Sequence, residues 1–349
     1  MDMYGNGSGV RARLSTPYKN SERSINHMTN KEIYTKTIGF SIRRILWDFV
    51  TLLIGVVLAV AGFLIADKLT DNGLIGLAIG MLAAIVLLVI AMRYISYMYK
   101  AGQIAMMTKA VTENSLPDDV IGEGKKIVKD RFATVAIFFA ATGVIKGIFN
   151  QLGRAITSVG EKIGGENGSN IGAAISTIIQ VIVAYLCDCC LGWVFYRRDA
   201  NAARATCEGA VLFFKNGKTF LKNMGRVFGM GLVSLVTIGG LFTGIFYGIF
   251  SAMPKAFDTL AAEITEIAAK ADTHISPALT DPNKLMLVCA LVVALLIWNF
   301  LHGAFIRPFI LVGVLRNYMQ AGIASSPTEE SFELLESKSA KFAKLRKQI

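Results

Sequence analysis

Long apolar runs alternate with shorter polar connections along this chain. A helix needs about 20 mostly apolar residues to cross the hydrocarbon core of a bilayer. Six segments reach or approach that length, and we expect a transmembrane helix in each: 46–66, 74–98, 132–149, 171–196, 227–252 and 285–307. The runs are continuous and do not show the alternation typical of β-barrel strands. The pattern therefore predicts an all-α, polytopic membrane protein with a six-span domain over residues 46–323.

The polar connections predict further elements around and between these spans. Pro117 and the acidic pair that follows it are typical of a break and a helix start near residue 120. Pro254 and the apolar positions after it recur at helical spacing. The expected elements are a polar, basic, largely disordered segment at 1–45, interfacial helices within 99–131 and 199–222, an amphipathic helix in the 253–284 loop, and a charged, partly helical tail at 324–349.

The composition supports the membrane class. Only 17% of the 349 residues are charged and 53% are hydrophobic, whereas soluble domains have about 25% charged residues. Intrinsic disorder as the main state is excluded, because the apolar content is too high.

The net charge of +11 carries an orientation signal. If the N-terminus is cytosolic, 27 of the 36 Lys and Arg residues fall in inner connections and six in outer loops, as the positive-inside rule requires. We therefore expect both termini in the cytosol and the protein in a plasma or cytoplasmic membrane. The inner basic segments predict anionic lipids as partners. No nucleic-acid partner is expected, because the basic residues are not gathered on one soluble face.

Several polar residues lie inside the predicted spans, where they are costly and need a reason. Asp188 lies in the fourth span, and Thr177 and Gln180 precede it as a polar stripe along that helix. In the sixth span, Asn299 and His302 are three residues apart and share a face. These five residues predict a solute path between the fourth and sixth spans, in which His302 pairs with Asp188. The alternative for Asp188 is a structural partner on another helix.

Pairs of glycines four residues apart recur in the spans. Glycines at this spacing remove side chains from one face of a helix and let a neighbouring backbone approach closely. We expect helix packing at Gly143 and Gly147 and at Gly244 and Gly248, either within the bundle or between the protomers of a homo-oligomer. Gly76 and Gly80 form a further pair.

No enzyme motif is recognisable, and we expect neither catalysis nor a cofactor. The chain contains no G-x-S-x-G, no H-E-x-x-H and no complete P-loop, and it has three histidines in all. The run Cys187-Asp188-Cys189-Cys190 could suggest a metal site. Adjacent cysteines on one helix point in different directions, however, and the chain has no second cysteine pair. Structural or acylated cysteines are therefore expected there, and no metal.

The C-terminal part resembles a known family. The stretch TCEGAVLFFKN (206–216) is similar to the cytosolic helix that precedes the penultimate core spans of choline transporter-like proteins. The tail SSPTEES (325–331), followed by Lys338 and Lys341, resembles the tail after the last span of that family. The resemblance implies transport of a quaternary amine such as choline. The chain departs from the family in its smaller number of predicted spans and in lacking the large outer loop with cysteines.

Two functions follow from these patterns. The first is a permease or channel-like transporter of a small solute, indicated by the polar residues within the spans. The second is a non-transporting scaffold or a subunit of a secretion or envelope complex, indicated by the glycine pairs and the basic inner segments. A permease requires a polar cavity that reaches deep into the membrane, whereas a scaffold requires a dry bundle and a binding partner.

Overall fold

A computed structural model describes residues 27–70, 73–132, 142–148, 168–270, 276–325 and 327–347. Throughout these ranges the regular structure is helical and no strand occurs. The all-α prediction is therefore confirmed for this part of the chain.

The elements follow one another along the chain as a series of long helices with short connections. They are α1 (Asn30–Thr70), α2 (Gly73–Glu113), α3 (Val120–Arg131), α5 (Gly168–Tyr196), α6 (Ala202–Ser234), α7 (Gly240–Ser251), α8 (Pro254–Lys270), α9 (Pro277–Thr280), α10 (Pro282–Leu301), α11 (Arg307–Ala324), α12 (Glu329–Lys338) and α13 (Ala340–Arg346). The π-helical segments η2 (Leu235–Gly239) and η3 (His302–Ile306) join α6 directly to α7 and α10 directly to α11. Residues 142–148 are also helical.

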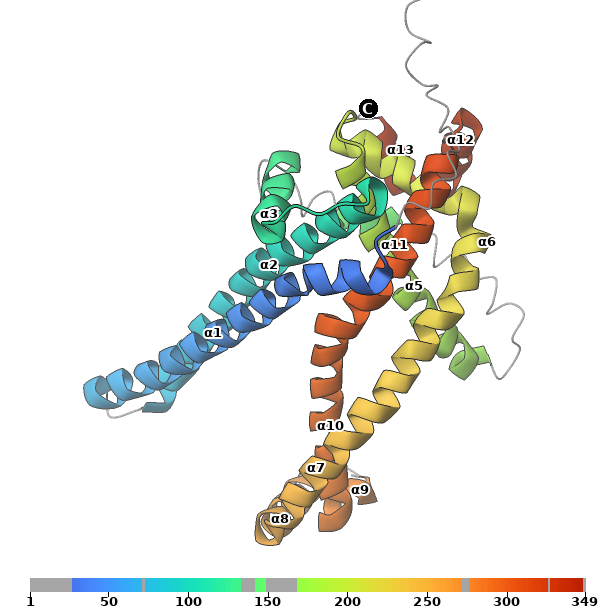
Figure 1. Ribbon diagram of the computed structural model, residues 1–349. Coiled ribbons are helices and arrows are strands. Elements are labelled where there is room, and N and C mark those ends of the chain that lie inside the picture. Colours follow the sequence, from blue (N-terminus) through green and yellow to red (C-terminus); the bar gives the residue numbers. More distant parts are fainter. Residues whose placement is uncertain are drawn as a thin grey trace, which may run out of the picture.

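Two long hairpins diverge from a common base (Figure 1). One consists of α1 packed along α2, and the other of α6 and α7 followed by α10 and α11. The main hydrophobic core lies at the base, where the second half of α2 meets the end of α5, the start of α6 and the middle of α11. The largest fully buried side chain of the described residues is Tyr318 of α11, whose hydroxyl donates a hydrogen bond to the carbonyl of Gly209 at 2.6 Å.

Three helices of the described chain are long and apolar enough to cross a membrane. They cover Asn30–Lys68, Val227–Ser251 and Pro282–Ala324, while Ala78–Ile90 and Gln180–Tyr196 are shorter apolar helices. In the most apolar windows of the first two, only 11% of the residues are buried within the chain. Exposed apolar faces of this extent need lipid or another protein surface to cover them. The membrane class is thus supported, and the count of six spans stays a prediction.

Two of the predicted connecting helices are present with the expected starts. Helix α3 begins at Val120, where the Asp119 side chain accepts a hydrogen bond from the backbone N–H of Gly122 at 2.8 Å. Such a bond satisfies one of the unpaired N–H groups of the first helical turn. Helix α8 begins at Pro254, where the missing N–H of proline costs nothing.

Other boundaries differ from the predicted ones. Helix α1 begins at Asn30, well before residue 46, because Ile33 and Phe40 are buried in the base; residues 1–26 lie outside the described part. The expected interfacial helix at 199–222 continues into the next span as α6, since no proline interrupts it. The expected interfacial segment at 99–131 is divided between the continuation of α2, which ends at Glu113, and α3.

Residues 142–148, the end of the third predicted span, lie against the tail. Ile145 and Ile148 are buried in a cluster that also contains Leu335 of α12 and Phe342 of α13. Phe132, the first residue of the same predicted span, belongs to the core of the base. Residues 133–141 lie outside the described part. Both described ends of this segment therefore pack among the elements of the base.

Close helix packing occurs at the Gly76 and Gly80 pair. A Cβ atom on Gly80 would lie 2.6 Å from the backbone oxygen of Leu58, so α1 and α2 touch backbone to backbone there. A Cβ atom on Gly143, Gly244 or Gly248 would meet nothing within 4 Å, and one on Gly147 would meet the Lys341 side chain. Gly147 therefore packs against the tail of its own chain, and packing of Gly143, Gly244 and Gly248 between protomers stays a prediction.

The close approach in the first hairpin predicts a contrast between two glycine-to-alanine variants. Gly80→Ala should lower the free energy of unfolding by about 1–3 kcal/mol, because the methyl group forces two backbones apart. Gly244→Ala, with open space around it, should be neutral or gain up to about 1 kcal/mol from helix propensity. Equilibrium unfolding in mixed micelles measures both. Equal stability of the two variants would contradict the packing at Gly80.

Candidate functional site

Asp188 is the centre of an ion-pair cluster that joins three helices. Its Oδ1 lies 2.7 Å from Nζ of Lys100 on α2, and its Oδ2 lies 2.7 Å from Nη2 of Arg307 on α11. The Asp188 side chain is only 6% exposed, whereas those of Lys100 and Arg307 are 40% and 29% exposed. A buried carboxylate needs such compensation, because an isolated charge in a medium of low dielectric constant is very costly.

The surroundings of Arg307 extend this cluster along α5. The guanidinium also donates to the carbonyl of Ala184 at 3.2 Å and stacks over the ring of Tyr185, 5.5 Å from its centroid. The Tyr185 hydroxyl and Nε of Arg307 are buried and have no hydrogen-bond partner among the described protein atoms. Buried polar groups of this kind are usually satisfied by water or by a ligand. The cluster can therefore accept a further polar group.

A second polar cluster joins the two helices of the other hairpin. The Ser234 hydroxyl lies 3.1 Å from Nε1 of Trp298 and 3.2 Å from Nδ1 of His302, and it is also 2.7 Å from the carbonyl of Gly231. A hydroxyl has one hydrogen and two acceptor sites. When it donates to Gly231, the indole and the imidazole Nδ1 both donate to it, which leaves Nε2 of His302 as the free acceptor.

The Ser234 cluster coincides with the two π-helical segments found among the described residues. Segment η2 begins directly after Ser234, and η3 begins at His302. Pro308 follows η3 within the first turn of α11 and has no N–H to donate to a preceding carbonyl, so regular hydrogen bonding cannot continue there. Single π-helical turns within longer helices are frequent at functional sites.

The structure separates the residues of the predicted solute path. Asp188 is bound by Lys100 and Arg307, and His302 lies instead beside Ser234. Gln180 and Asn299 are exposed, and the side chain of Thr177 lies outside the described part. The pairing of Asp188 with His302 is therefore absent from the structure, and the structural alternative, a partner on another helix, is the one observed.

The sequence did not single out four members of these two clusters: Lys100, Arg307, Ser234 and Trp298. Lys100 falls in the connection 99–131, and Arg307 is the last residue of the predicted span 285–307. For Arg307, its position directly before Pro308 in an apolar run was the available signal. No comparable signal marked Ser234, because serine is common in membrane helices.

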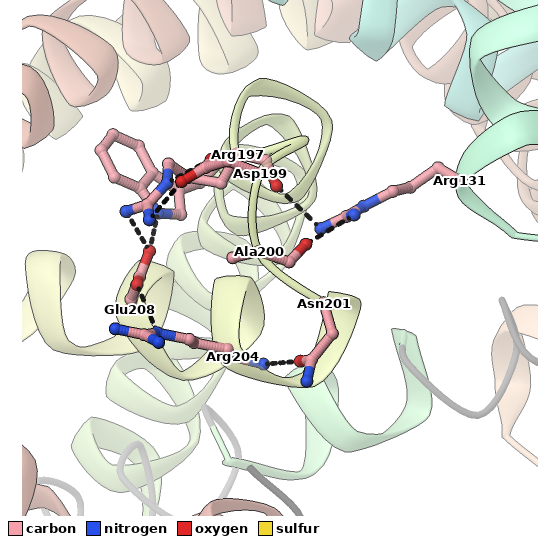
Figure 2. Close-up of polar contacts among 8 residues, drawn as sticks. Arg131, Arg197, Asp199, Ala200, Asn201, Arg204 and Glu208 are labelled. Carbon is pink, nitrogen blue, oxygen red and sulfur yellow. Dashed lines mark hydrogen bonds and ion pairs between the residues drawn. The ribbon is translucent and has the colours of Figure 1, made fainter. Parts of the chain in front are cut away.

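The turn between α5 and α6 holds a third polar network (Figure 2). Glu208 is buried, and its carboxylate lies 2.6 Å from Nη1 of Arg197 and 3.4 Å from Nε of Arg204. Arg131 at the end of α3 donates to the backbone carbonyls of Ala200 at 2.8 Å and Arg197 at 3.0 Å. These bonds connect α3 to the turn and hold α5 and α6 side by side.

Arg197 and Asp199 form a bidentate pair in the same turn, with both N···O distances at 2.9 Å. The hydrogen bond from Arg197 lowers the pKa of the Asp199 carboxyl below its ordinary value of 3.8 and raises the pKa of Arg197. A lowered carboxyl pKa stabilises the fold above the unfolded-state pKa, and this contribution is lost as the pH falls through the folded-state value. The contribution is small, because the Asp199 side chain is 69% exposed.

The cysteines are packing groups in the structure. Cys189 and Cys190 are buried, and Sγ of Cys190 lies 3.6 Å from the carbonyl of Thr206 on α6. Burial raises the pKa of the Cys207 thiol to about 12. Within the described ranges, no group of three His, Cys, Asp or Glu side chains is arranged to hold a metal ion.

Comparison of the chain with family models, with curated proteins and with solved structures gives no match. The resemblance to choline transporter-like proteins therefore stays a prediction.

The Asp188 cluster predicts a strong effect of a nearly isosteric substitution. Asp188→Asn should lower the free energy of unfolding by about 3–5 kcal/mol, because it leaves two partly buried cations without their counter-charge. Asp199→Asn is the matched control and should cost less than about 1 kcal/mol, since Asp199 is 69% exposed and Arg197 keeps Glu208 as its counter-charge. Unfolding in mixed micelles compares the two, and similar losses would show that Asp188 is not the organising charge.

Burial of Cys207 predicts slow chemical modification. With a pKa of about 12, only about one thiol in ten thousand is ionised at pH 8, and thiolate is the reactive form. Peptide mapping after maleimide treatment should show Cys207 unmodified in the folded protein and modified after unfolding. A cysteine introduced by Ser337→Cys on the exposed side of α12 is the positive control. Rapid labelling of native Cys207 would contradict its burial.

Proposed function

We propose that the chain is a permease or channel-like transporter of a small solute. The observation that carries this proposal is the coincidence of two π-helical segments with the Ser234 cluster, in two apolar helices that pack against each other. Transport sites are commonly built where membrane helices lose regular geometry and backbone or polar groups become free to bind a solute.

The proposed path differs from the one expected from the sequence. It passes between α6 and α10, where Ser234 and His302 supply the solute-binding groups. The Asp188 cluster lies at the base and is joined to the end of η3 through Arg307, the residue that directly follows this segment. Its two buried atoms without partners, on Tyr185 and Arg307, provide hydrogen-bonding capacity for water or solute at that end. Gln180, Asn299 and Thr177 have no assigned role in this path.

We further propose that both termini lie in the cytosol of a plasma or cytoplasmic membrane. The hairpin geometry supports a shared side for the termini, because α1 starts and α12 and α13 end at the base (Figure 1). The basic inner connections support the cytosol as that side. Residues 142–148 of the third predicted span pack against the tail, and this favours fewer than six full crossings.

A scaffold or complex subunit is the second candidate function. The observation that favours it is the low burial of the apolar helices. In the first two candidate spans, only 11% of the residues in the most apolar stretch are buried within the chain. Such faces fit other membrane helices as well as lipid. Under this function the protein co-purifies with a partner or a second copy, and no solute crosses.

Flux through purified protein in liposomes tests the transport proposal. Stopped-flow light scattering after a challenge with urea, glycerol or choline chloride should show permeation of at least one of these solutes above that of empty liposomes. Ser234→Ala and His302→Gln should each reduce that flux by about tenfold, the effect of losing one hydrogen bond to a polar solute. Phe300→Leu, at an exposed position of α10, is the control and should leave the flux unchanged.

Two outcomes would overturn the proposal. One is the absence of flux for every probe solute. The other is unaltered flux in the Ser234 and His302 variants when their thermal unfolding matches that of the unsubstituted protein. Either result together with a co-purifying membrane partner would favour the scaffold.

A further inference from the structure

A cavity of about 270 Å³ lies where the start of α1 meets α6 and α11. Its walls combine two kinds of side chain. The apolar walls are Val227, Met230, Phe309, Ile310 and Val314, and the polar groups are Asn30, Arg316 and Asn317, with Gly313 between them. A cavity with this lining suits a ligand that has both an apolar and a polar part.

Arg316 gives the polar end a positive charge. Its Nη2 donates to the carbonyl of Met28, while its Nε is buried and has no hydrogen-bond partner among the described atoms. In the described part of the chain, no carboxylate lies within ion-pair distance of this guanidinium. A partly buried cation without a counter-charge favours an anion in the adjoining space.

The apolar and the polar residues of the cavity lie at different positions along the helices. Val227 and Met230 are at the beginning of the apolar helix Val227–Ser251. Along α11, Phe309 and Ile310 are about two turns nearer to the apolar helix α10 than Arg316 and Asn317 are. The apolar walls therefore lie toward the apolar helices Val227–Ser251 and α10, and the cation and the amide of Asn317 lie farther from α10. A phospholipid at a bilayer surface has the same order of groups.

We propose that this cavity binds an anionic glycerophospholipid. The phosphate accepts hydrogen bonds from Arg316 and from the amide groups of Asn30 and Asn317, and an acyl chain lies along Val227, Phe309 and Ile310. The bound lipid joins α1, α6 and α11 and so connects the two hairpins at the membrane surface. This site is independent of any transport activity.

Thermal unfolding of the full chain in dodecyl maltoside, titrated with short-chain lipids, tests the proposal. Dioctanoyl phosphatidylglycerol should raise the Tm with saturation, as a ligand of the native state does. Dioctanoyl phosphatidylcholine, with the same chains and no net charge, should stabilise much less. Inorganic phosphate, which lacks an acyl chain, should have little effect. Equal effects of the two lipids, or full protection by phosphate alone, would overturn the proposal.

Two substitutions act separately on the charge of the site and on the space within it. Arg316→Gln should weaken the apparent affinity for phosphatidylglycerol about tenfold, as expected for the loss of a charge-assisted hydrogen bond. Gly313→Leu should weaken it by filling the space, since a Cβ atom at this position already lies 3.3 Å from Nδ2 of Asn30. Lys126→Gln, at an exposed position on α3, removes an equal charge elsewhere and should leave the affinity unchanged.

A further variant separates lipid binding from the structural bond of Arg316. The Met28 backbone N–H donates to Oδ1 of Asn114 at 2.6 Å, so Asn114→Ala loosens the same segment, and Asn114 is not among the residues that line the cavity. Asn114→Ala should keep the response to phosphatidylglycerol. If it abolishes the response as Arg316→Gln does, or if both cavity variants keep the response, the cavity is not the lipid site.

Discussion

The buried carboxylate of Asp188 sets the arrangement of the base, on which both hairpins depend. A charge that is almost removed from water requires close counter-charges, and here they come from two other helices: Lys100 on α2 and Arg307 on α11. Each ion pair restricts the rotation and translation of the helix that carries it. The carboxylate thus acts as a common point of attachment for α2, α5 and α11, and the hydrophobic core around Tyr318 and Trp193 surrounds the same junction.

Beyond that junction the chain provides little burial for its apolar helices. The hairpins α1–α2 and α7–α10 diverge (Figure 1), and their outer faces carry exposed leucine, isoleucine and valine side chains. In water this exposure would be unstable, whereas in a bilayer the lipid tails cover it at no cost. In the described part of the chain, these apolar surfaces are interrupted by a cavity with Arg316 in its wall and by a polar cluster at two π-helical segments.

Local chemistry explains which predictions agree with the structure. The cap at Asp119, the start of α8 at Pro254 and the apolar character of the spans depend on neighbouring residues, so the sequence alone was sufficient for them. The choice of partner for Asp188 depends on Arg307, which is 119 residues away. Periodicity places Asp188 and His302 inside spans, but it does not show which helices are neighbours. The predicted pairing of these two residues assumed that the fourth and sixth spans lie side by side.

The sequence by itself determined the class of the protein, because the length and continuity of apolar runs admit only helices that bury their backbone hydrogen bonds in lipid. It also marked Asp188 as a residue that needs compensation. Only the tertiary structure decided that Lys100 and Arg307 supply it, that His302 binds Ser234, and that residues 142–148 pack against the tail. The physical reason is that hydropathy acts residue by residue along one helix, whereas the pairing of charges depends on distances between helices that the whole chain must bring together.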